Sequence, residues 1–361
     1  MKGLLLAGGQ GTRLRPLTYT GNKHMLPVAN KPIIHYGLEQ LKNAGITEIG
    51  VILGPMKEGI EETIGDGSRF GVRVKYIDQP EPKGIAHAIG IAEDFIGCDP
   101  FVVYLGDNLL KNGIKPFVEE FEKVTWDELL LLSRIDDITK RMRFGVAHLK
   151  NGEVIRVIEK PEKPEEIASD LVMVGIYMFR SRIFEAIKEL KPSWRNELEI
   201  TDAIQKLIDW GYKVVPRVTK GWWKDTGKPE NLLEANQLVL SDLKPDVRGV
   251  IEDEVTIRGN VSIDKGTIIR KGSSIRGPVI IGENCDIGPN VYIGPYTSIG
   301  DNSVISKGEI EQSIVIGDTV IECEKRIVDS IIGRYTKIIS NNNNLPKGTK
   351  FLVGDSCFLS I

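Results

Sequence analysis

Residues 275–305 read IRGPVIIGENCDIGPNVYIGPYTSIGDNSVI, and an isoleucine opens every hexapeptide of this stretch. The spacing extends back to Ile251, so that ten isoleucines recur every six positions from Ile251 to Ile305. A small or β-branched residue, such as Val279 or Cys285, stands four positions after most of them. Hexapeptide repeats are typical of a parallel β-helix, in which each repeat supplies one short strand and one turn. We therefore predict a left-handed parallel β-helix in residues 244–361, with the isoleucines stacked inside it.

The repeat changes towards the carboxyl end of the chain. Its phase breaks after Ile305 and returns loosely at Ile310, Ile316, Ile332 and Ile338. Loop excursions or an incomplete coil explain this pattern better than a new domain does. From Asn341 onward the segment NNNNLPKG predicts an irregular tail. Stacked coils can serve stability or assembly alone, and we favour that role over a second active site.

The length and composition of the chain are typical of a soluble protein with two domains. The chain has 361 residues, 41% of them hydrophobic, and a formal net charge of -3. This length suffices for two domains, and the near-neutral charge argues against a nucleic-acid partner. No run of about 18 apolar residues is present, so we expect no membrane span and a cytoplasmic location. The four cysteines lie far apart, which gives no support to a zinc or redox site.

Residues 1–243 alternate between strand-like and helix-like segments, which predicts an α/β fold with a mostly parallel sheet and helices on both faces. The predicted strands cover residues 2–7, 48–53, 72–77, 101–105, 129–133, 145–149, 154–159, 175–179 and 214–218. The predicted helices cover residues 32–44, 57–64, 85–95, 181–190, 201–210 and 229–243. We place a domain boundary after residue 243, where the β-helix repeat is about to begin.

A glycine-rich turn follows the first predicted strand, in the segment LAGGQGTRLRP of residues 6–16. Such a turn lies at the carboxyl edge of the sheet, where open α/β folds bind ligands. Glycines let backbone N–H groups approach phosphate oxygens closely, and Arg13 adds a planar fork of donors. The glycine spacing matches neither GxGxxG nor the P-loop, so dinucleotide and P-loop folds are disfavoured.

Further charged residues are expected near this turn. Lys23 follows it closely, Asp107 follows the predicted strand FVVYL, and Asp225 follows an aromatic pair in WWKDTG. Glu159 ends another predicted strand. A single aspartate after a strand is usually a turn former. Two aspartates together with lysines and an arginine around a glycine turn, however, suit Mg²⁺ held between phosphates.

These motifs resemble those of the sugar-1-phosphate nucleotidylyltransferases. The matching segments, in chain order, are LAGGQGTRLRPLT, KHMLP, QPEPKGIAHA, LGDN, FGV, EKP, VGIY, NELEITDA and WWKDTG. Within the family the similarity is greatest to the long form of the glucose-1-phosphate thymidylyltransferases, in which a β-helix extends the catalytic domain. The resemblance implies a Rossmann-like nucleotidyltransferase domain that transfers a nucleotidyl group from dTTP to glucose 1-phosphate, giving dTDP-glucose and pyrophosphate with Mg²⁺ as cofactor.

The resemblance also implies roles for individual residues. Those expected at the nucleotide are Leu6, Gly8, Gly9, Gly11, Thr12, Arg13, Gln79 and Gly84, of which Gln79 and Gly84 would face a pyrimidine base. Those expected at the sugar phosphate are Gly145, Glu159, Lys160, Gly175, Tyr177 and Glu199, with Lys160 on the phosphate. Those expected to act in catalysis are Arg13, Lys23 and Asp107, with Asp107 and Asp225 as the Mg²⁺ ligands.

Two residues depart from the pattern of the short forms. His87 stands where short forms often have glutamine, and Lys83 replaces an acidic residue. A single histidine on a predicted helix is expected to serve packing or capping. The implied reaction needs no general base, because a sugar phosphate is already an anion at neutral pH. Its main barrier is the approach of two anions, which positive charge would lower.

Other functions fit the sequence less well. UTP could replace dTTP, because thymine and uracil differ by one methyl group, worth only about 1–3 kcal/mol in an apolar pocket. An additional acetyltransferase activity in the β-helix is disfavoured, because such transfer usually needs a histidine base and every histidine lies at or before His148. A β-helix rich in Ile and Val favours self-association, so we expect a homo-oligomer, a trimer or a tetramer.

Overall fold

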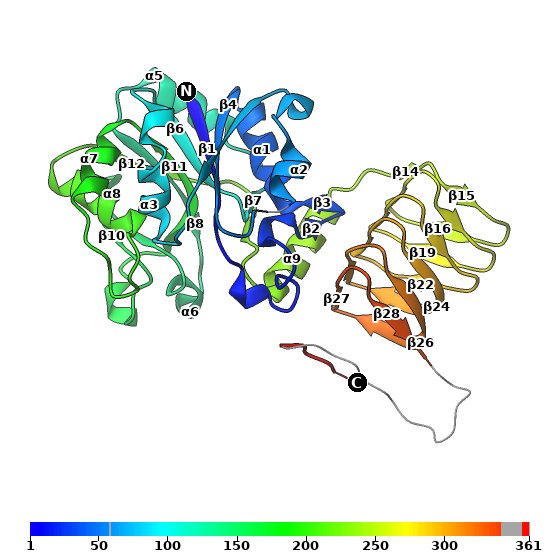
Figure 1. Ribbon diagram of the computed structural model, residues 1–361. Helices are drawn as coiled ribbons and strands as arrows, with labels where there is room; N and C mark the ends of the chain where they lie inside the picture. Colours follow the sequence, from blue (N-terminus) through cyan, green and yellow to red (C-terminus); the bar gives the residue numbers. More distant parts are fainter. Residues whose placement is uncertain (58, 341–355, 361) are drawn as a thin grey trace. The chain divides into compact units, whose positions relative to one another are not determined.

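The computed structural model describes residues 1–57, 59–340 and 356–360, and contacts divide the chain into two compact units (Figure 1). The first unit comprises Met1–Gln10, Gly21–Met25 and Ile33–Asp225. The second comprises Gly11–Thr20, Leu26–Pro32 and Thr226–Ile361, so it includes two short segments from the amino-terminal part of the chain. The domain boundary expected after residue 243 stays a prediction. The predicted tail lies largely outside the described residues.

The first unit is built on a sheet whose central strands are parallel. β1 (Lys2–Ala7) lies between β4 (Glu48–Leu53) and β6 (Phe101–Leu105), and β5 (Arg73–Asp78) pairs with the outer edge of β4. β1, β4 and β6 are buried apolar runs, as expected of parallel strands with helices on both faces. Their predicted bounds are confirmed.

The remaining strands extend the sheet beyond β6. β11 (Leu171–Phe179) runs antiparallel to β6 and to β8 (Glu128–Arg134), and β12 (Val214–Val218) is parallel to β8. β9 (Val146–Lys150) and β10 (Glu153–Ile158) form an antiparallel pair beside the start of β11. The predicted α/β fold class is confirmed.

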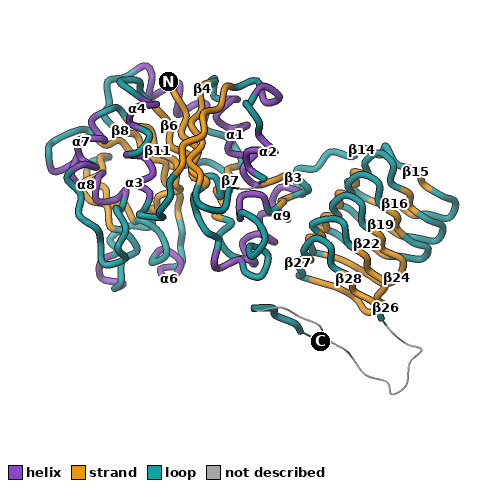
Figure 2. Tube along the Cα trace, in the orientation of Figure 1, coloured by secondary structure: helices purple, strands orange, loops and turns teal. Residues whose placement is uncertain are grey.

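Helices cover both faces of the sheet, as Figure 2 shows. Neighbouring residues of a strand point to opposite faces, so Leu4 and Leu5 belong to different core clusters. The cluster around Leu5 includes residues of α1 (Ile33–Asn43), α2 (Ile60–Ile64) and α5 (Lys115–Lys123). The cluster around Leu4 includes residues of α3 (Ile85–Gly90), α4 (Glu93–Ile96), α7 (Arg182–Lys188) and α8 (Ile200–Asp209). Short elements between these are η3 (Ser68–Phe70), α6 (Ile138–Arg141) and η4 (Pro164–Glu166). Across the described residues, none of the helices combines the length and the apolar character needed to cross a bilayer.

The second unit contains the predicted parallel β-helix, whose three faces are parallel sheets. One face is formed by β14 (Asp246–Val247), β17 (Val261–Ile263), β20 (Val279–Ile281), β23 (Thr297–Ile299), β25 (Ile314–Val315) and β27 (Ile331–Ile332). The other faces are formed by β15 (Val250–Ile251), β16 (Thr256–Arg258), β18 (Ile268–Ile269), β19 (Ser274–Arg276), β21 (Asp286–Ile287), β22 (Tyr292–Ile293), β24 (Val304–Glu311), β26 (Val320–Val328) and β28 (Lys337–Ile339). Three hexapeptides make one coil, so Ile251 pairs with Ile269, and Ile269 with Ile287.

The break in the repeat marks shorter coils within the same β-helix. Ile293 pairs with Ile310, which lies 17 residues later instead of 18. That column continues from Ile310 to Ile327, and the neighbouring column runs from Ile305 through Ile321 to Ile338. Because the strands keep stacking in register, the phase change does not end the domain.

A buried polar network holds two further elements of the second unit on the β-helix. These elements are α9 (Pro229–Leu240) and the hairpin of β2 (Pro27–Val28) and β3 (Lys31–Pro32). The side-chain oxygen of Asn236, on α9, accepts hydrogen bonds from the Ala29 backbone N–H (2.8 Å) and the Ser298 hydroxyl (2.7 Å). The Asn30 amide at the hairpin tip donates to the Ile299 carbonyl (2.7 Å).

Candidate functional site

The candidate site lies where the strand order of the central sheet reverses. From β1 the chain proceeds to β4 and β5 on one side, and then returns to β6 on the other side of β1. In open α/β sheets ligands bind in the crevice at such a switch point, outside the carboxyl ends of the strands. Here β1 ends before Gly8 and Gly9, and β6 ends before Gly106 and Asp107. The Gly106 N–H donates to the Leu6 carbonyl (2.9 Å), which holds the two strand ends together.

A buried ion pair occupies this edge. Lys23, at the start of η2 (Lys23–Met25), forms an ion pair with Asp107, and each side chain is only 14% exposed. Burial by itself would raise the pKa of Asp107, but the charge of Lys23, His24 and hydrogen bonding outweigh it and lower that pKa to about 2. Burial and the adjacent Lys23 lower the pKa of His24 to about 3, with Asp107 opposing, so His24 is neutral at pH 7. The edge thus carries one fixed negative and one fixed positive charge.

The glycine turn packs directly on side chains of this site. A Cβ atom at Gly9 would lie 2.9 Å from the Lys23 Nζ, and one at Gly8 would lie 2.8 Å from the Gln79 Oε1. Real side-chain carbons do not approach neighbours this closely, so both positions need glycine unless Lys23 and Gln79 move. The structure therefore brings Gly8, Gly9, Lys23, Gln79 and Asp107 together, while their roles at a ligand stay predictions.

The base-side residues Gln79 and Gly84 also lie close together. Gln79 directly follows β5, its side chain is 5% exposed, and its Nε2 donates to the Gly84 carbonyl (3.3 Å). Gln79 Nε2 also lies 2.9 Å from the Nδ1 of His87. The sequence predicted only packing or capping for His87, so its contact with Gln79 is a feature that sequence reasoning missed. The sign available in the sequence was that His87 stands where the short forms often have glutamine.

The second predicted metal ligand is placed by a short ladder. β13 (Trp223–Asp225) pairs antiparallel with β7 (Asn108–Leu110), and Asp225 stands opposite Asn108, the neighbour of Asp107. The described residues contain no group of three or more His, Cys, Asp or Glu side chains suited to hold a metal. Mg²⁺ is usually held by one or two carboxylates together with substrate phosphates and waters. Two aspartates at this edge, Asp107 and a residue opposite its neighbour Asn108, therefore fit this ion.

A second charged cluster lies where β11 begins, at the same edge of the sheet as the end of β6. The Arg195 guanidinium lies 3.4 Å from a Glu159 carboxylate oxygen and 3.3 Å from one of Glu199. The Lys160 ammonium also pairs with Glu159 (3.3 Å), and the Ser193 hydroxyl donates to Glu199 (2.8 Å). Burial and the neighbouring Glu199 raise the pKa of Glu159, while Lys160 and Arg195 oppose this shift. Arg195 was missed from the sequence, although it directly precedes the NELEITDA motif.

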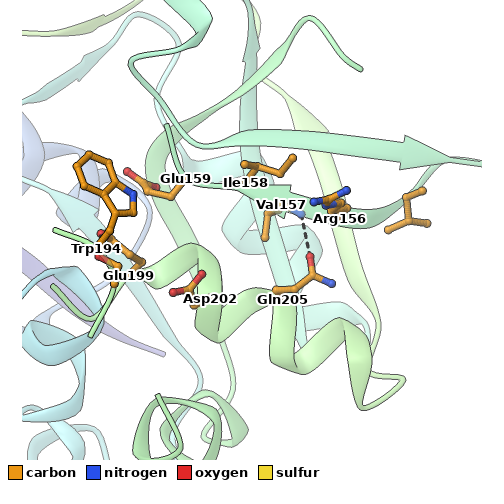
Figure 3. A pocket seen from close by; sticks show the side chains of 10 residues that line it. Arg156, Val157, Ile158, Glu159, Trp194, Glu199, Asp202 and Gln205 are labelled. Atoms are coloured by element: carbon orange, nitrogen blue, oxygen red, sulfur yellow. Dashed lines mark hydrogen bonds between the residues drawn. The ribbon is translucent and has the colours of Figure 1, made fainter. Parts of the chain in front are cut away.

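This cluster borders a cavity of about 450 Å³ between β10 and α8. Figure 3 shows Glu159, Glu199 and Asp202 around the cavity, with Trp194 beside the two glutamates. The Trp194 side chain is 76% exposed. Burial and Glu199 raise the pKa of Asp202. The cavity therefore combines carboxylates with an exposed aromatic ring, groups that suit a polyhydroxylated ligand.

Of the remaining residues expected at the sugar phosphate, the two glycines lie near the charged clusters, whereas Tyr177 lies in the core. A Cβ atom at Gly145 would lie 3.5 Å from a Glu159 oxygen, and one at Gly175 would lie 3.1 Å from the Asn108 side chain. Both glycines therefore lie beside residues of the two clusters. Tyr177, in contrast, is 3% exposed and packs in the core, and burial raises its pKa. The Leu6 side chain also belongs to the core, so only its backbone could meet a ligand.

Gly11, Thr12 and Arg13 belong to the second compact unit, whereas the site residues described above belong to the first. Gly11 has a left-handed backbone (φ 63°) and precedes η1 (Thr12–Leu14), and its carbonyl accepts a hydrogen bond from the Thr18 hydroxyl (2.8 Å). The Arg13 side chain is exposed. Their roles at the nucleotide stay predictions.

Known proteins similar to this chain share both its parts. The family model described as Nucleotidyl transferase matches residues 2–242, and that of the GMPPB C-terminal domain matches residues 275–344. The low-salt glycan biosynthesis nucleotidyltransferase Agl11 of Haloferax volcanii is 49% identical over 363 residues, with 100% of each chain covered. A glucose-1-phosphate thymidylyltransferase of Streptomyces griseus is 42% identical over 356 residues, with 98% of each chain covered.

The solved structures agree with these relatives. A putative glucose-1-phosphate thymidylyltransferase from Bacillus anthracis, in complex with a sucrose, is 42% identical with a TM-score of 0.62. It covers 68% of this chain, and 97% of that chain is matched. The resemblance inferred from the motifs is confirmed, and the chain belongs to the nucleotidyl transferase family, among the sugar-1-phosphate nucleotidylyltransferases.

Proposed function

We propose that this protein transfers the nucleotidyl group of dTTP to glucose 1-phosphate, giving dTDP-glucose and pyrophosphate. The observation that carries the proposal is the buried Lys23–Asp107 pair beside the Gly8–Gly9 turn at the β1–β6 switch point. Glucose-1-phosphate thymidylyltransferase is also the name of a relative that matches 98% of the chain. The finer choice of dTTP and glucose rests on that similarity.

The proposed chemistry is a direct displacement at phosphorus. An oxygen of the sugar phosphate attacks the α-phosphorus of the nucleotide, and the bond to the pyrophosphate oxygen breaks. The attacking oxygen is already anionic, so no residue has to remove a proton from it. The barrier comes from the approach of two anions, which fixed positive charge lowers most in a site that excludes water. Lys23, which is largely buried next to Gly9, supplies such a charge.

We propose Asp107 and Asp225 as the residues that would hold Mg²⁺. When bound, the ion would neutralise phosphate charge and orient the triphosphate. The low pKa of Asp107 keeps this carboxylate ionised over the whole range in which the enzyme would work. The β7–β13 ladder holds Asp225 opposite Asn108, the residue after Asp107.

The cluster at the start of β11 suits the sugar phosphate. Glu159 and Glu199 can accept hydrogen bonds from sugar hydroxyls, while Lys160 and Arg195 can pair with the phosphate. Trp194 offers an apolar ring face at the cavity to the C–H groups of a hexose. We propose that Arg195 joins Lys160 in binding the phosphate, a role the motif pattern did not assign to it.

A substrate matrix tests the proposal. The purified protein is incubated with Mg²⁺, each of dTTP, UTP, CTP, ATP and GTP, and several hexose 1-phosphates, and the sugar nucleotide is identified by mass. We expect dTDP-glucose as the main product and UDP-glucose as the second, because one methyl group separates the two bases. Product formed only with a purine nucleotide, or with no sugar 1-phosphate at all, would refute the proposal.

The β-helix is proposed to serve stability and assembly. An arm of the same assay with acetyl-coenzyme A and glucosamine 1-phosphate is expected to give no acetylated product, because residues 244–361 contain no histidine. Self-association as a trimer or tetramer stays a prediction, which light scattering at micromolar concentration would check. A monodisperse monomer would contradict it.

A further inference from the structure

His87 lies against the side chain that is expected to read the base. It stands on α3, and its Nδ1 is 2.9 Å from the Nε2 of Gln79. Gln79 is almost completely buried, whereas His87 is half-buried. A buried amide that can rotate by half a turn presents either a donor or an acceptor to a ligand, so its orientation decides what it selects.

The hydrogen bonds around Gln79 fix that orientation. The Nε2 group also approaches the Gly84 carbonyl oxygen (3.3 Å), and a carbonyl oxygen can only accept. The atom beside Gly84 and His87 is therefore the NH₂ group of the amide. The carbonyl oxygen, Oε1, then points the other way, towards the Gly8 turn, where a Cβ atom would lie 2.8 Å from it.

The same contact fixes the state of the histidine. Because the NH₂ group donates, the Nδ1 of His87 must accept, so the imidazole is neutral and carries its proton on Nε2. Burial and the nearby Lys83 lower the pKa of His87, while Glu81 opposes this shift, so the neutral form is the one present near pH 7. A leucine or alanine at this position would leave the NH₂ group with only the longer bond to Gly84.

We propose that His87 is a positioning residue that fixes the Gln79 carbonyl oxygen as an acceptor for the base. An acceptor here favours a base with an N–H donor on its pairing edge. Thymine and uracil carry such a donor at N3, whereas cytosine presents a lone pair there, which would face the lone pairs of Oε1. The inference rests on the proposed function in one respect, namely that Gln79 faces the base. It goes beyond that function by assigning the selection against cytosine to a residue that does not touch the nucleotide.

Two substitutions at His87 separate positioning from packing. His87→Leu removes the acceptor and keeps an apolar side chain on α3, whereas His87→Gln restores an acceptor through its own amide carbonyl. His148→Leu is the matched control, because His148 is also half-buried and accepts one hydrogen bond, from the Ala168 N–H (3.2 Å). If His87→Leu has a clearly lower melting temperature than the wild type, His87→Ala is measured in its place, because it removes the same hydrogen-bond acceptor.

The measurements are the dissociation constants of UTP and CTP with Mg²⁺, and kcat/KM for each with glucose 1-phosphate. For the wild type and for His148→Leu we expect UTP to be preferred over CTP by about 100-fold, because an unpaired buried acceptor rejects the wrong base strongly. We expect His87→Leu to lower this preference about tenfold, and His87→Gln to restore most of it.

The outcomes distinguish the two proposals. An unchanged UTP-to-CTP ratio in His87→Leu and His87→Ala, or an equal loss for both nucleotides, would overturn the role of His87. The His87 variants could change the ratio of the UTP and CTP dissociation constants while the wild type turns over no sugar 1-phosphate. That result would refute the proposed function and leave the role of His87 standing. Absence of UTP and CTP binding to the wild type would overturn the role of His87, and the substrate matrix with dTTP would then decide the proposed function.

Discussion

The two units of this protein differ in whether their charged side chains are buried or exposed. In the first unit, Lys23 and Asp107 are paired and mostly buried, and Glu199 is buried against Arg195. In the β-helix, the interior consists of apolar and small side chains, and charged pairs such as Arg270–Asp286 lie on the outside, each side chain more than a third exposed. The first unit therefore carries an electrostatic cost that the β-helix avoids.

The difference indicates which unit performs chemistry. Burying a charge costs free energy even when it is paired, and a hydrophobic pair of similar size is often at least as stable. Charges buried at the carboxyl edge of the sheet are thus better explained by a ligand that they meet than by stability. The isoleucine columns of the β-helix, in contrast, are explained by stability of the fold alone.

The largest effect is expected from Asp107→Asn. Loss of this carboxylate should reduce kcat/KM by about 10³-fold or more, because its charge acts in the water-excluded site. The amide oxygen can still accept a hydrogen bond from Lys23, but the buried ammonium loses its counter-charge, so the melting temperature should fall while the protein still folds. Pyrophosphate release and melting are measured in parallel. The matched variant is Asp318→Asn in the β-helix, where Asp318 pairs with Arg334 (2.6 Å), and it should keep full activity. Near-normal turnover in Asp107→Asn would contradict the contrast between the units.

The next effect is on stability, in the β-helix. Ile293→Ala should lower the free energy of unfolding by about 2–5 kcal/mol, because the side chain is fully buried and leaves a cavity. Ile251→Ala is the matched variant in the first coil, where Ile251 is 36% exposed, and it should cost clearly less. Chemical denaturation followed by circular dichroism measures both. Equal losses in the two variants would mean that the stacked interior does not control stability.

A smaller effect is expected at Glu128, which is fully buried in the first unit and has no hydrogen-bond partner on either oxygen among the described residues. Burial, with Asp127 nearby, raises its pKa well above the usual value. The unfolded chain therefore loses this proton at lower pH than the folded one, and stability falls as pH rises above about 4.5. Below that pH the group is protonated in both states and has no such effect.

Glu128→Gln removes this titration. The variant should be more stable than the wild type at pH 8, and the difference should shrink as the pH is lowered towards 4. Denaturation at a series of pH values measures it. Glu120→Gln is the control, because hydrogen bonding to Arg217 lowers the pKa of Glu120 and its effect has the opposite sign. A pH-independent difference for Glu128→Gln would show that the carboxyl is already ionised in the folded protein.

The smallest effect is expected at the surface of the β-helix. Arg270 forms two hydrogen bonds of 2.5 Å with Asp286, but both side chains are exposed to solvent and salt. Exposed pairs contribute little, so Arg270→Ala should leave the melting temperature and the activity unchanged within error. A large loss of stability would show that the outer charges, and not the isoleucine columns, hold the coils together.

Regular patterns in the sequence predicted most of the fold. The six-residue spacing predicted the β-helix, because every coil repeats the same local interactions. Where coils shorten, from Ile293 to Ile310, the pattern weakened while the stacking persisted. α5 was not predicted, because its segment KPFVEEFEK buries only Val118 and Phe121 and otherwise reads as a charged loop.

The candidate site could be predicted only where a motif marks it. The sequence placed Lys23, Asp107 and the glycines at one sheet edge, since strand ends define that edge. It could not place Arg195 between Glu159 and Glu199, or His87 beside Gln79, because these contacts join side chains from different elements. It also gave no sign that Glu128 is buried without a partner, because β8 continues as the apolar run LLLL directly after it.

The central claim is that the first unit joins a sugar phosphate directly to the α-phosphorus of a nucleotide. The most direct test incubates the wild-type protein with Mg²⁺, glucose 1-phosphate and dTTP labelled at the α-phosphate, and follows the label and the pyrophosphate together. We predict that the label enters the sugar nucleotide, that pyrophosphate appears in equal amount, and that neither forms without the sugar phosphate. Label bound to the protein, or pyrophosphate released at the same rate without glucose 1-phosphate, would contradict the claim.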